Sequence, residues 1–260
     1  MESDFFSVAG LFISFGGIKA LQDINFSMEK GEIFSVIGPN GAGKTTLFNC
    51  ISGLYRPDQG RIRFKGTPVE KKTPHAIASL GIARTFQNIE LFSHMNTMEN
   101  IMLGRHLHMN TGLFKGMFMW GRHSHAAREE AVHRKKVEGI IDLLELQKVR
   151  DIPVGALPYG TQKLIELARA LALEPELLLL DEPCAGMNLE EKQDMIFWIK
   201  DIQDDLGITI LLIEHDMKLV MDISDRILAI NFGKPITMGS PDQVRQNSEV
   251  LKAYIGEEDI

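Results

Sequence analysis

Cysteine is scarce in this chain of 260 residues, which contains two, Cys50 and Cys184. Two cysteines are too few for a disulfide framework, so we expect both to remain reduced and to pack as small apolar side chains. Long hydrophobic runs are also missing, because none approaches the roughly 18 to 20 apolar residues of a membrane-spanning helix. The sequence starts with MESD, which lacks the basic region of a signal peptide. We therefore expect the chain to stay in the cytosol.

A basic surface is missing as well, since the formal net charge is −7 at pH 7 and lysine and arginine form no stripe along the sequence. Binding to the phosphate backbone of nucleic acid normally needs clustered basic residues, so we expect no nucleic-acid partner. The sequence also has no internal repeat and no Asn-Lys-x-Asp string of the kind that reads guanine in a GTPase. With 44% hydrophobic residues, the chain can form one large globular domain or two small ones.

What the chain does have is a glycine-rich loop between two apolar segments. The loop matches each fixed position of the phosphate-binding pattern G-x-x-x-x-G-K-[ST]. It follows the apolar run 33–37 and precedes the run 47–51, so strand, loop and helix occur in the order that this motif needs. The residues that we predict to bind nucleotide phosphates are Gly38, Pro39, Asn40, Gly41, Ala42, Gly43, Lys44, Thr45 and Thr46.

The residue types in this loop suit a nucleotide and a metal ion. Glycine lets the backbone wrap around an anion and point successive N–H groups at it, and the helix that follows adds the positive end of its dipole. Lys44 is expected to neutralise the outer phosphates. The Thr45 hydroxyl is expected to enter the Mg²⁺ shell, because this ion prefers oxygen ligands and is usually shared with substrate phosphates.

Two later segments place polar side chains at the ends of short apolar runs. The run 177–180 ends in Asp181 and Glu182, and the run 208–213 leads to His215. Such runs are typical of buried parallel strands that deliver polar groups to the carboxyl edge of a sheet. Asp181 suits the Mg²⁺ shell, and Glu182 suits a general base beside a γ-phosphate. His215 either bonds a γ-phosphate oxygen or is a structural histidine.

The remaining pattern predicts a small sheet at the start of the chain and helices in the middle. Residues 5–14 and 21–28 read as two antiparallel strands, joined near Phe15, which either stacks on a nucleotide base or is buried under the turn. From about 88 to 175 the periodicity is helical, which predicts a helical insert. Its segment 113–120 is dense in apolar residues, which either pack within the insert or dock a partner.

Taken together, these motifs resemble the ATP-binding cassette family, the ATPase subunits of ABC transporters, over essentially the whole chain. In this likeness the glycine-rich loop is the Walker A loop, and Asp181 and Glu182 close the Walker B motif. The resemblance implies that Phe15 stacks on adenine and that His215 is the switch histidine. It also implies that Gln87 is the glutamine of the Q-loop, which lies near Mg²⁺ and takes part in coupling to the membrane subunit.

The signature motif departs from the family pattern. The signature sequence, usually Leu-Ser-Gly-Gly-Gln, begins here at Leu157 and continues with Pro158, Tyr159, Gly160 and Thr161. In the family, the serine hydroxyl and the helix N-terminus behind it contact the γ-phosphate of ATP held by the opposing subunit. Pro158 supplies neither a hydroxyl nor an N–H, although proline is well tolerated at a helix start, so Gly160 and the helix dipole are expected to make this contact.

The resemblance implies a single cassette domain over residues 1–260 with an α/β fold. Its P-loop NTPase (RecA-like) core is expected at 5–87 and 176–260, with an N-terminal antiparallel β subdomain. The helical insert is expected at 88–175, facing the membrane subunits.

Local strings, among them RTFQ at 84–87 and DEPCAGMN at 181–188, are most similar to the LivG family of branched-chain amino-acid importer ATPases. This implies hydrolysis of ATP with Mg²⁺, a second ATPase subunit in a homo- or heterodimer, two transmembrane permease subunits and, indirectly, a periplasmic binding protein. It also implies a peripheral location at the cytoplasmic face of the inner membrane. ATPases of urea or amide import and of lipopolysaccharide export share much of this pattern. The altered signature leaves open a nucleotide-gated binding subunit with little hydrolysis.

Overall fold

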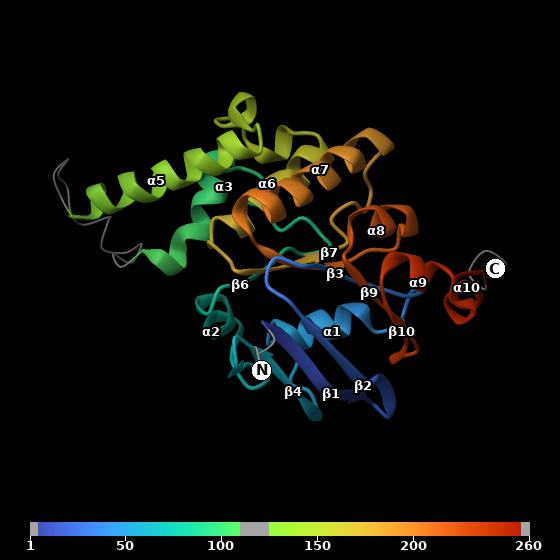
Figure 1. Ribbon diagram of the computed structural model, residues 1–260. Helices are drawn as coiled ribbons and strands as arrows, with labels where there is room; N and C mark the ends of the chain where they lie inside the picture. The colour runs from blue at the N-terminus through green and yellow to red at the C-terminus, as the bar shows by residue number, and fades with distance from the viewer. Residues whose placement is uncertain (1–4, 110–124, 256–260) are drawn as a thin grey trace.

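The structure, a computed structural model, describes residues 5–109 and 125–255. The apolar segment 113–120 lies outside the described residues. Figure 1 shows the chain in layers, with one sheet at the bottom, a second sheet across the middle and several helices above it.

The middle layer is a six-stranded sheet with the order β10-β9-β3-β8-β7-β6. β3 pairs in parallel with β8 and β9, and β7 pairs in parallel with β8 and β6, whereas β10 runs antiparallel to β9. The parallel strands predicted at 177–180 and 208–213 are therefore confirmed, as is the α/β fold class. The strands are β3 (Ile33–Ile37), β6 (Ile82–Arg84), β7 (Leu177–Asp181), β8 (Thr209–Ile213), β9 (Arg226–Asn231) and β10 (Lys234–Gly239).

The lower layer is a four-stranded antiparallel sheet with the order β2-β1-β4-β5. This confirms the sheet predicted at the start of the chain. The first two strands are joined by Gly16 and Gly17, whose φ angles of 57° and 86° are ones that glycine adopts without strain. Because this turn is so short, β2 starts three residues before the predicted position 21. The strands are β1 (Phe6–Phe15), β2 (Ile18–Met28), β4 (Gln59–Phe64) and β5 (Thr67–Pro68).

Both faces of the six-stranded sheet are covered, which explains its continuous apolar strands. Helix α1 (Lys44–Ile51) lies between the two sheets (Figure 1). Leu177 and Leu179 of β7 pack in the cluster that contains α1 and the lower sheet, whereas Leu178 and Leu180 pack with the helices on the opposite face. This alternation follows from the two-residue period of a strand. The sheet is thus a rigid support for the residues at its carboxyl edge.

Most of the helices lie above the six-stranded sheet or beside its β10 edge (Figure 1). Between β6 and β7 the chain is helical over α3 (Thr97–Leu103), α5 (His125–Leu143), α6 (Tyr159–Leu171) and the 3-10 turns η1 (Gly104–His108), η2 (Gln147–Val149) and η3 (Val154–Ala156). The other helices are α2 (Pro74–Ser79), α7 (Leu189–Leu206), α8 (Met217–Ile223), α9 (Pro241–Arg245) and α10 (Ser248–Ile255). The division into a core and an insert at 88–175 stays a prediction. Among the described residues, no helix has the length and apolar character needed to cross a membrane.

Candidate active site

The glycine-rich loop connects β3 to α1 and folds around its own lysine. The buried Lys44 side chain donates from Nζ to the backbone oxygens of Gly38, at 2.6 Å, and Pro39, at 3.1 Å. A Cβ atom at Gly38 would lie 2.2 Å from the Ile230 oxygen, and Gly43 has a φ of 106°. The backbone therefore needs glycine at both positions, and the loop encloses a space suited to an anion.

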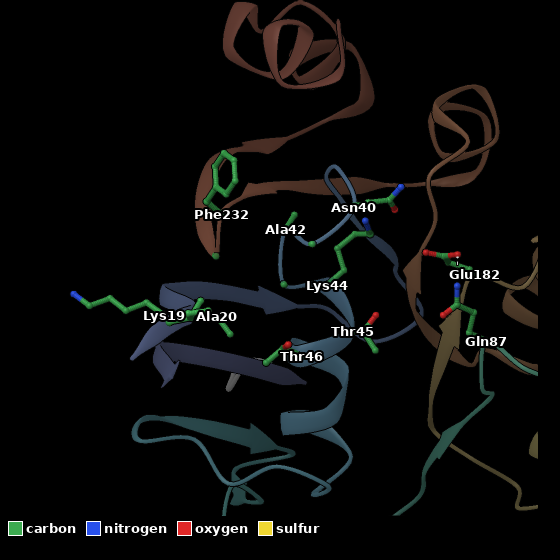
Figure 2. A pocket seen from close by; sticks show the side chains of 14 residues that line it. Lys19, Ala20, Asn40, Ala42, Lys44, Thr45, Thr46, Gln87, Glu182 and Phe232 are labelled. Carbon is green, nitrogen blue, oxygen red and sulfur yellow. Dashed lines mark hydrogen bonds between the residues drawn. The ribbon is translucent and has the colours of Figure 1, made fainter. Parts of the chain in front are cut away.

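This loop forms one wall of a pocket of about 380 Å³. Figure 2 shows Lys44 and Thr45 in the middle of the site, Gln87 and Glu182 on one side, and Phe232 on the other. The lining residues are Ile18, Lys19, Ala20, Asn40, Gly41, Ala42, Gly43, Lys44, Thr45, Thr46, Gln87, Glu182, Phe232 and Gly233. The pocket thus joins most of the predicted phosphate loop to the predicted general base Glu182 and to Gln87, which was predicted to lie near Mg²⁺.

Sequence reasoning missed the turn that lines the far end of the pocket. Gly233, between β9 and β10, accepts a hydrogen bond from Gln22 N at 2.7 Å and donates one to Ala42 O at 2.9 Å. It therefore links the phosphate loop to β2. The neighbouring Phe232 is 79% exposed and presents an apolar ring beside the pocket. Gly233, which follows the apolar run 227–230, is the one sequence signal that could have indicated this turn.

Phe15 lies outside the set of residues that line the pocket. Its ring packs edge-on against Tyr55, with centroids 5.1 Å apart, and the side chain is 45% exposed. Its predicted stacking on adenine stays a prediction. Ile18 and Phe232 are the large apolar side chains that do line this pocket among the described residues.

Glu182, Gln87 and His215 converge at one side of the site. Gln87 Nε2 donates to Glu182 Oε2 at 3.0 Å, and His215 Nδ1 lies 3.7 Å from the same oxygen. Glu182 has a φ of 48° directly after β7, a backbone conformation that is uncommon outside glycine. Its side chain remains 14% exposed, whereas that of His215 is 53% exposed. The strand ends thus bring together three residues that are distant in the sequence.

Asp181, one residue earlier, is almost completely buried. Its Oδ2 accepts a hydrogen bond from Arg84 Nη2 at 2.8 Å. Its Oδ1 is buried without a hydrogen-bond partner among the residues that the structure describes. A buried carboxylate oxygen of this kind fits a metal ion or a metal-bound water, and the exposed Thr45 lines the neighbouring pocket. The residues present therefore suit Mg²⁺ bound together with nucleotide phosphates.

Glu214, which precedes His215, is a further acid that sequence reasoning did not single out. It is completely buried and accepts hydrogen bonds from the backbone N–H groups of Cys184, at 2.9 Å, and His215, at 3.2 Å. Burial raises the pKa of Glu214, while these hydrogen bonds act in the opposite direction. Glu214 thereby connects the end of β8 to the segment after Glu182.

The signature residues form the start of α6. None of them is among the described residues that line this pocket. Pro158 is the N-cap and makes no side-chain capping bond. A Cβ atom at Gly160 would lie 2.6 Å from Glu191 Oε1, and one at Gly186 would lie 3.1 Å from the Tyr159 ring. The helix N-terminus is therefore packed closely against the segment that follows the Walker B residues.

Comparison with known proteins identifies the family. A family model described as "ABC transporter" matches residues 21–185. The chain belongs to the ABC transporter family. ATP hydrolysis is the general activity of this ATP-binding cassette, so the chain is an ABC-type transporter ATPase. Members of this family form dimers and work with transmembrane components. A second model, described as "Branched-chain amino acid ATP-binding cassette transporter", matches residues 234–260.

Relatives of this cassette are similar over nearly their full length. The chain is 42% identical to the high-affinity branched-chain amino acid transport ATP-binding protein BraF of Pseudomonas aeruginosa, covering 99% of this chain and 100% of that protein. It is 41% identical to the protein LivG of Escherichia coli K12, which bears the same description, with the same coverage.

Solved structures of ATP-binding cassettes share the fold. A nucleotide-free cassette from an ABC transporter superposes with a TM-score of 0.83 at 28% identity, covering 97% of this chain and 99% of that one. A cassette in its ADP conformation gives a TM-score of 0.84 at 29% identity, covering 98% and 99%.

Proposed function

We propose that this cassette binds Mg-ATP in the pocket and hydrolyses it to energise an importer of branched-chain amino acids. The observation that carries the proposal is the arrangement of Lys44 and Glu182 in one pocket. A phosphate loop that folds around its lysine forms one wall, and an acid held by Gln87 stands at the other side. In this arrangement, a γ-phosphoryl group would lie between the ammonium group of Lys44 and the carboxylate of Glu182.

Each residue has a defined task in this proposal. The loop N–H groups and Lys44 hold the β- and γ-phosphates, and Glu182 takes a proton from the attacking water as that water bonds to the γ-phosphorus. The bond from the γ-phosphorus to its bridging oxygen breaks, and ADP and phosphate leave. Gln87 orients the carboxylate, and His215 bonds a γ-phosphate oxygen. Thr45, Asp181 and Gln87 would hold Mg²⁺, which neutralises charge on the phosphates when it is bound.

The partners follow from the same proposal. The cassette pairs with a second cassette, and the start of α6, from Pro158 to Thr161, contacts the ATP of that partner. Two permease subunits and a periplasmic binding protein complete the transporter, with the cassette at the cytoplasmic face of the inner membrane. Because Pro158 can donate neither a hydroxyl nor an N–H hydrogen bond to the γ-phosphate, the ATP site completed by this signature is the weaker hydrolytic one in a heterodimer.

The transported solute is proposed from the relatives. BraF and LivG are described as serving high-affinity branched-chain amino acid transport, and both match this chain over their whole length. The second family model supports the same substrate class.

Reconstitution tests the proposal. The cassette, a candidate partner cassette, the candidate permeases and a candidate binding protein are assembled in proteoliposomes, and phosphate release is measured with leucine, isoleucine, valine or urea. We expect branched-chain amino acids to stimulate hydrolysis and urea to leave it at its basal rate. Stimulation by urea alone would contradict the substrate class, and hydrolysis that no partner or solute changes would contradict the role in import.

A further inference from the structure

Arg84, the last residue of β6, connects three elements around the proposed metal site. Its Nη2 donates to Asp181 Oδ2 at the end of β7, at 2.8 Å. Its Nη1 donates to Asn49 Oδ1 of α1, at 2.7 Å, and to Ser52 Oγ just after that helix, at 2.9 Å. One guanidinium therefore joins the strand before the Q-loop, the helix after the phosphate loop and the Walker B strand.

Two phenylalanine rings lie close to this guanidinium. Its central carbon lies 5.6 Å from the centroid of the Phe48 ring and 5.2 Å from that of Phe86, the residue before Gln87. The Arg84 side chain is 7% exposed and that of Asp181 is 3% exposed. Cation–π contacts together with a rigid donor fork restrict the guanidinium to one orientation.

This arrangement decides which Asp181 oxygen is available to a cation. Oδ2 is occupied by Arg84, whereas Oδ1 is the buried oxygen that lacks a hydrogen-bond partner among the described residues. The positive charge of Arg84 also balances a carboxylate that β7 would otherwise bury alone. Arg84 therefore holds the Asp181 side chain so that Oδ1, and not Oδ2, is the oxygen left for a cation.

We infer that Arg84 is a positioning residue for Mg²⁺, acting through Asp181, and that it transmits the position of α1 and Phe86 to the metal site. This inference rests on the proposed function, because it assumes that Asp181 binds Mg²⁺ together with ATP. Partners that orient a metal-binding group typically change metal affinity by about 10- to 100-fold when they are removed. Replacing an arginine with a purely structural role would change the free energy of unfolding without selectively lowering the Mg²⁺ affinity.

The test is a Mg²⁺ titration of the whole chain with a fluorescent ATP analogue, alongside binding of the analogue in EDTA. For Arg84→Gln we expect Mg²⁺ affinity to fall by about tenfold or more while binding in EDTA changes less than about twofold. Arg84→Lys, which keeps the charge and loses the fork, should lie between the wild type and Arg84→Gln. In an Asp181→Asn background, Arg84→Gln should have no further effect on Mg²⁺ affinity.

The matched control is Arg226→Gln. Arg226 also contacts a phenylalanine ring, Phe34, at 5.3 Å, and pairs with Glu32 at 3.2 Å, but it lies at the start of β9, away from the carboxyl edge of the sheet. Equal Mg²⁺ affinities for Arg84→Gln and Arg226→Gln, both folded, would overturn the inference. If Arg84→Gln does not fold, Asn49→Ala replaces it, because that variant removes an anchor of the guanidinium and leaves the ion pair. Unchanged Mg²⁺ affinity of Asn49→Ala would then overturn the inference.

A failure of the proposed function gives a different result. Wild-type protein whose binding of the analogue does not depend on Mg²⁺ would contradict the proposed Mg-ATP site itself. If the wild type binds the analogue in a Mg²⁺-dependent way and Arg84→Gln keeps the same Mg²⁺ affinity, only the positioning role of Arg84 is contradicted.

Discussion

Gln87 and Glu182 are joined by a hydrogen bond of 3.0 Å from the glutamine amide to the carboxylate, which ties the segment after β6 to the end of β7. His215 Nδ1 lies 3.7 Å from the same carboxylate oxygen. A displacement of Gln87 therefore changes the position of Glu182. In the proposed mechanism, this connects the segment expected to contact the membrane subunits with the general base.

Glu182→Gln is expected to bind ATP as the wild type does and to hydrolyse it about 10² to 10⁴ times more slowly, the usual contribution of a positioned base. The amide keeps the size of the side chain but takes up no proton from water. Phosphate release and binding of a fluorescent ATP analogue measure the two effects. Glu190→Gln, an exposed substitution in the first turn of α7, is the control for loss of a negative charge. Wild-type turnover in Glu182→Gln would contradict the role of general base.

The sequence predicted those parts of the site that depend on local backbone requirements. Two glycines of the phosphate loop are required locally, because a Cβ atom would lie 2.2 Å from Ile230 O at Gly38 and 2.6 Å from Ala20 O at Gly43. The ends of β7 and β8 were predictable since four or more apolar residues precede a polar one. Contacts between distant segments were not, and Arg84, 97 positions before Asp181, has no local signal for its ion pair.

The elements that sequence reasoning missed are short or half-exposed. β10 includes Pro235 and has no fully buried residue, so it lacks the apolar alternation of a strand, and pairing with β9 decides its conformation. Helix α8 has 7 residues, too few to show a helical period. Phe232 gave no signal because its place beside the pocket depends on how the β9–β10 turn meets β2.

Lys163→Met is expected to lower the free energy of unfolding by at most about 3–5 kcal/mol, because it removes the nearer of two cations beside the buried Glu166 and leaves Arg169, whose Nη2 lies 4.0 Å from Glu166 Oε1. Lys163 Nζ lies 3.8 Å from Glu166 Oε2, with the two side chains 3% and 2% exposed. The same Nζ donates to Gln87 O at 2.6 Å, which fixes the Q-loop backbone on α6. Urea unfolding measures the change.

The double variant Lys163→Met/Glu166→Leu distinguishes the buried charge from lost packing. It should be more stable than Lys163→Met alone, because neither charge is then buried without a partner. If the double variant loses as much free energy of unfolding as Lys163→Met and Glu166→Leu lose together, the two residues do not interact.

As the pH rises, the free energy of unfolding of the wild type is expected to fall relative to that of Glu214→Gln. Burial raises the pKa of Glu214 above the ordinary value of 4.5, so the folded protein binds the proton more tightly than the unfolded chain does. The wild type therefore loses this contribution as the pH rises through the folded-state pKa, whereas glutamine does not titrate. Urea unfolding of both proteins at several pH values, from about 4.5 to about 7.5, tests this. A difference that stays constant with pH would contradict it.

Both cysteines are expected to resist alkylation in the folded protein. Cys50 and Cys184 are buried, and burial raises the pKa of both thiols, that of Cys50 to about 12. Since the thiolate is the reactive form, Cys50 should react at pH 8 roughly 10³ times more slowly than an unperturbed thiol. Iodoacetamide labelling of the native protein and of the protein in guanidinium chloride, with Cys50→Ala and Cys184→Ala to assign each thiol, measures the rates. Equal rates in the two conditions would mean that these side chains are accessible, and would contradict the burial of Cys50 in α1 and of Cys184 after the Walker B residues.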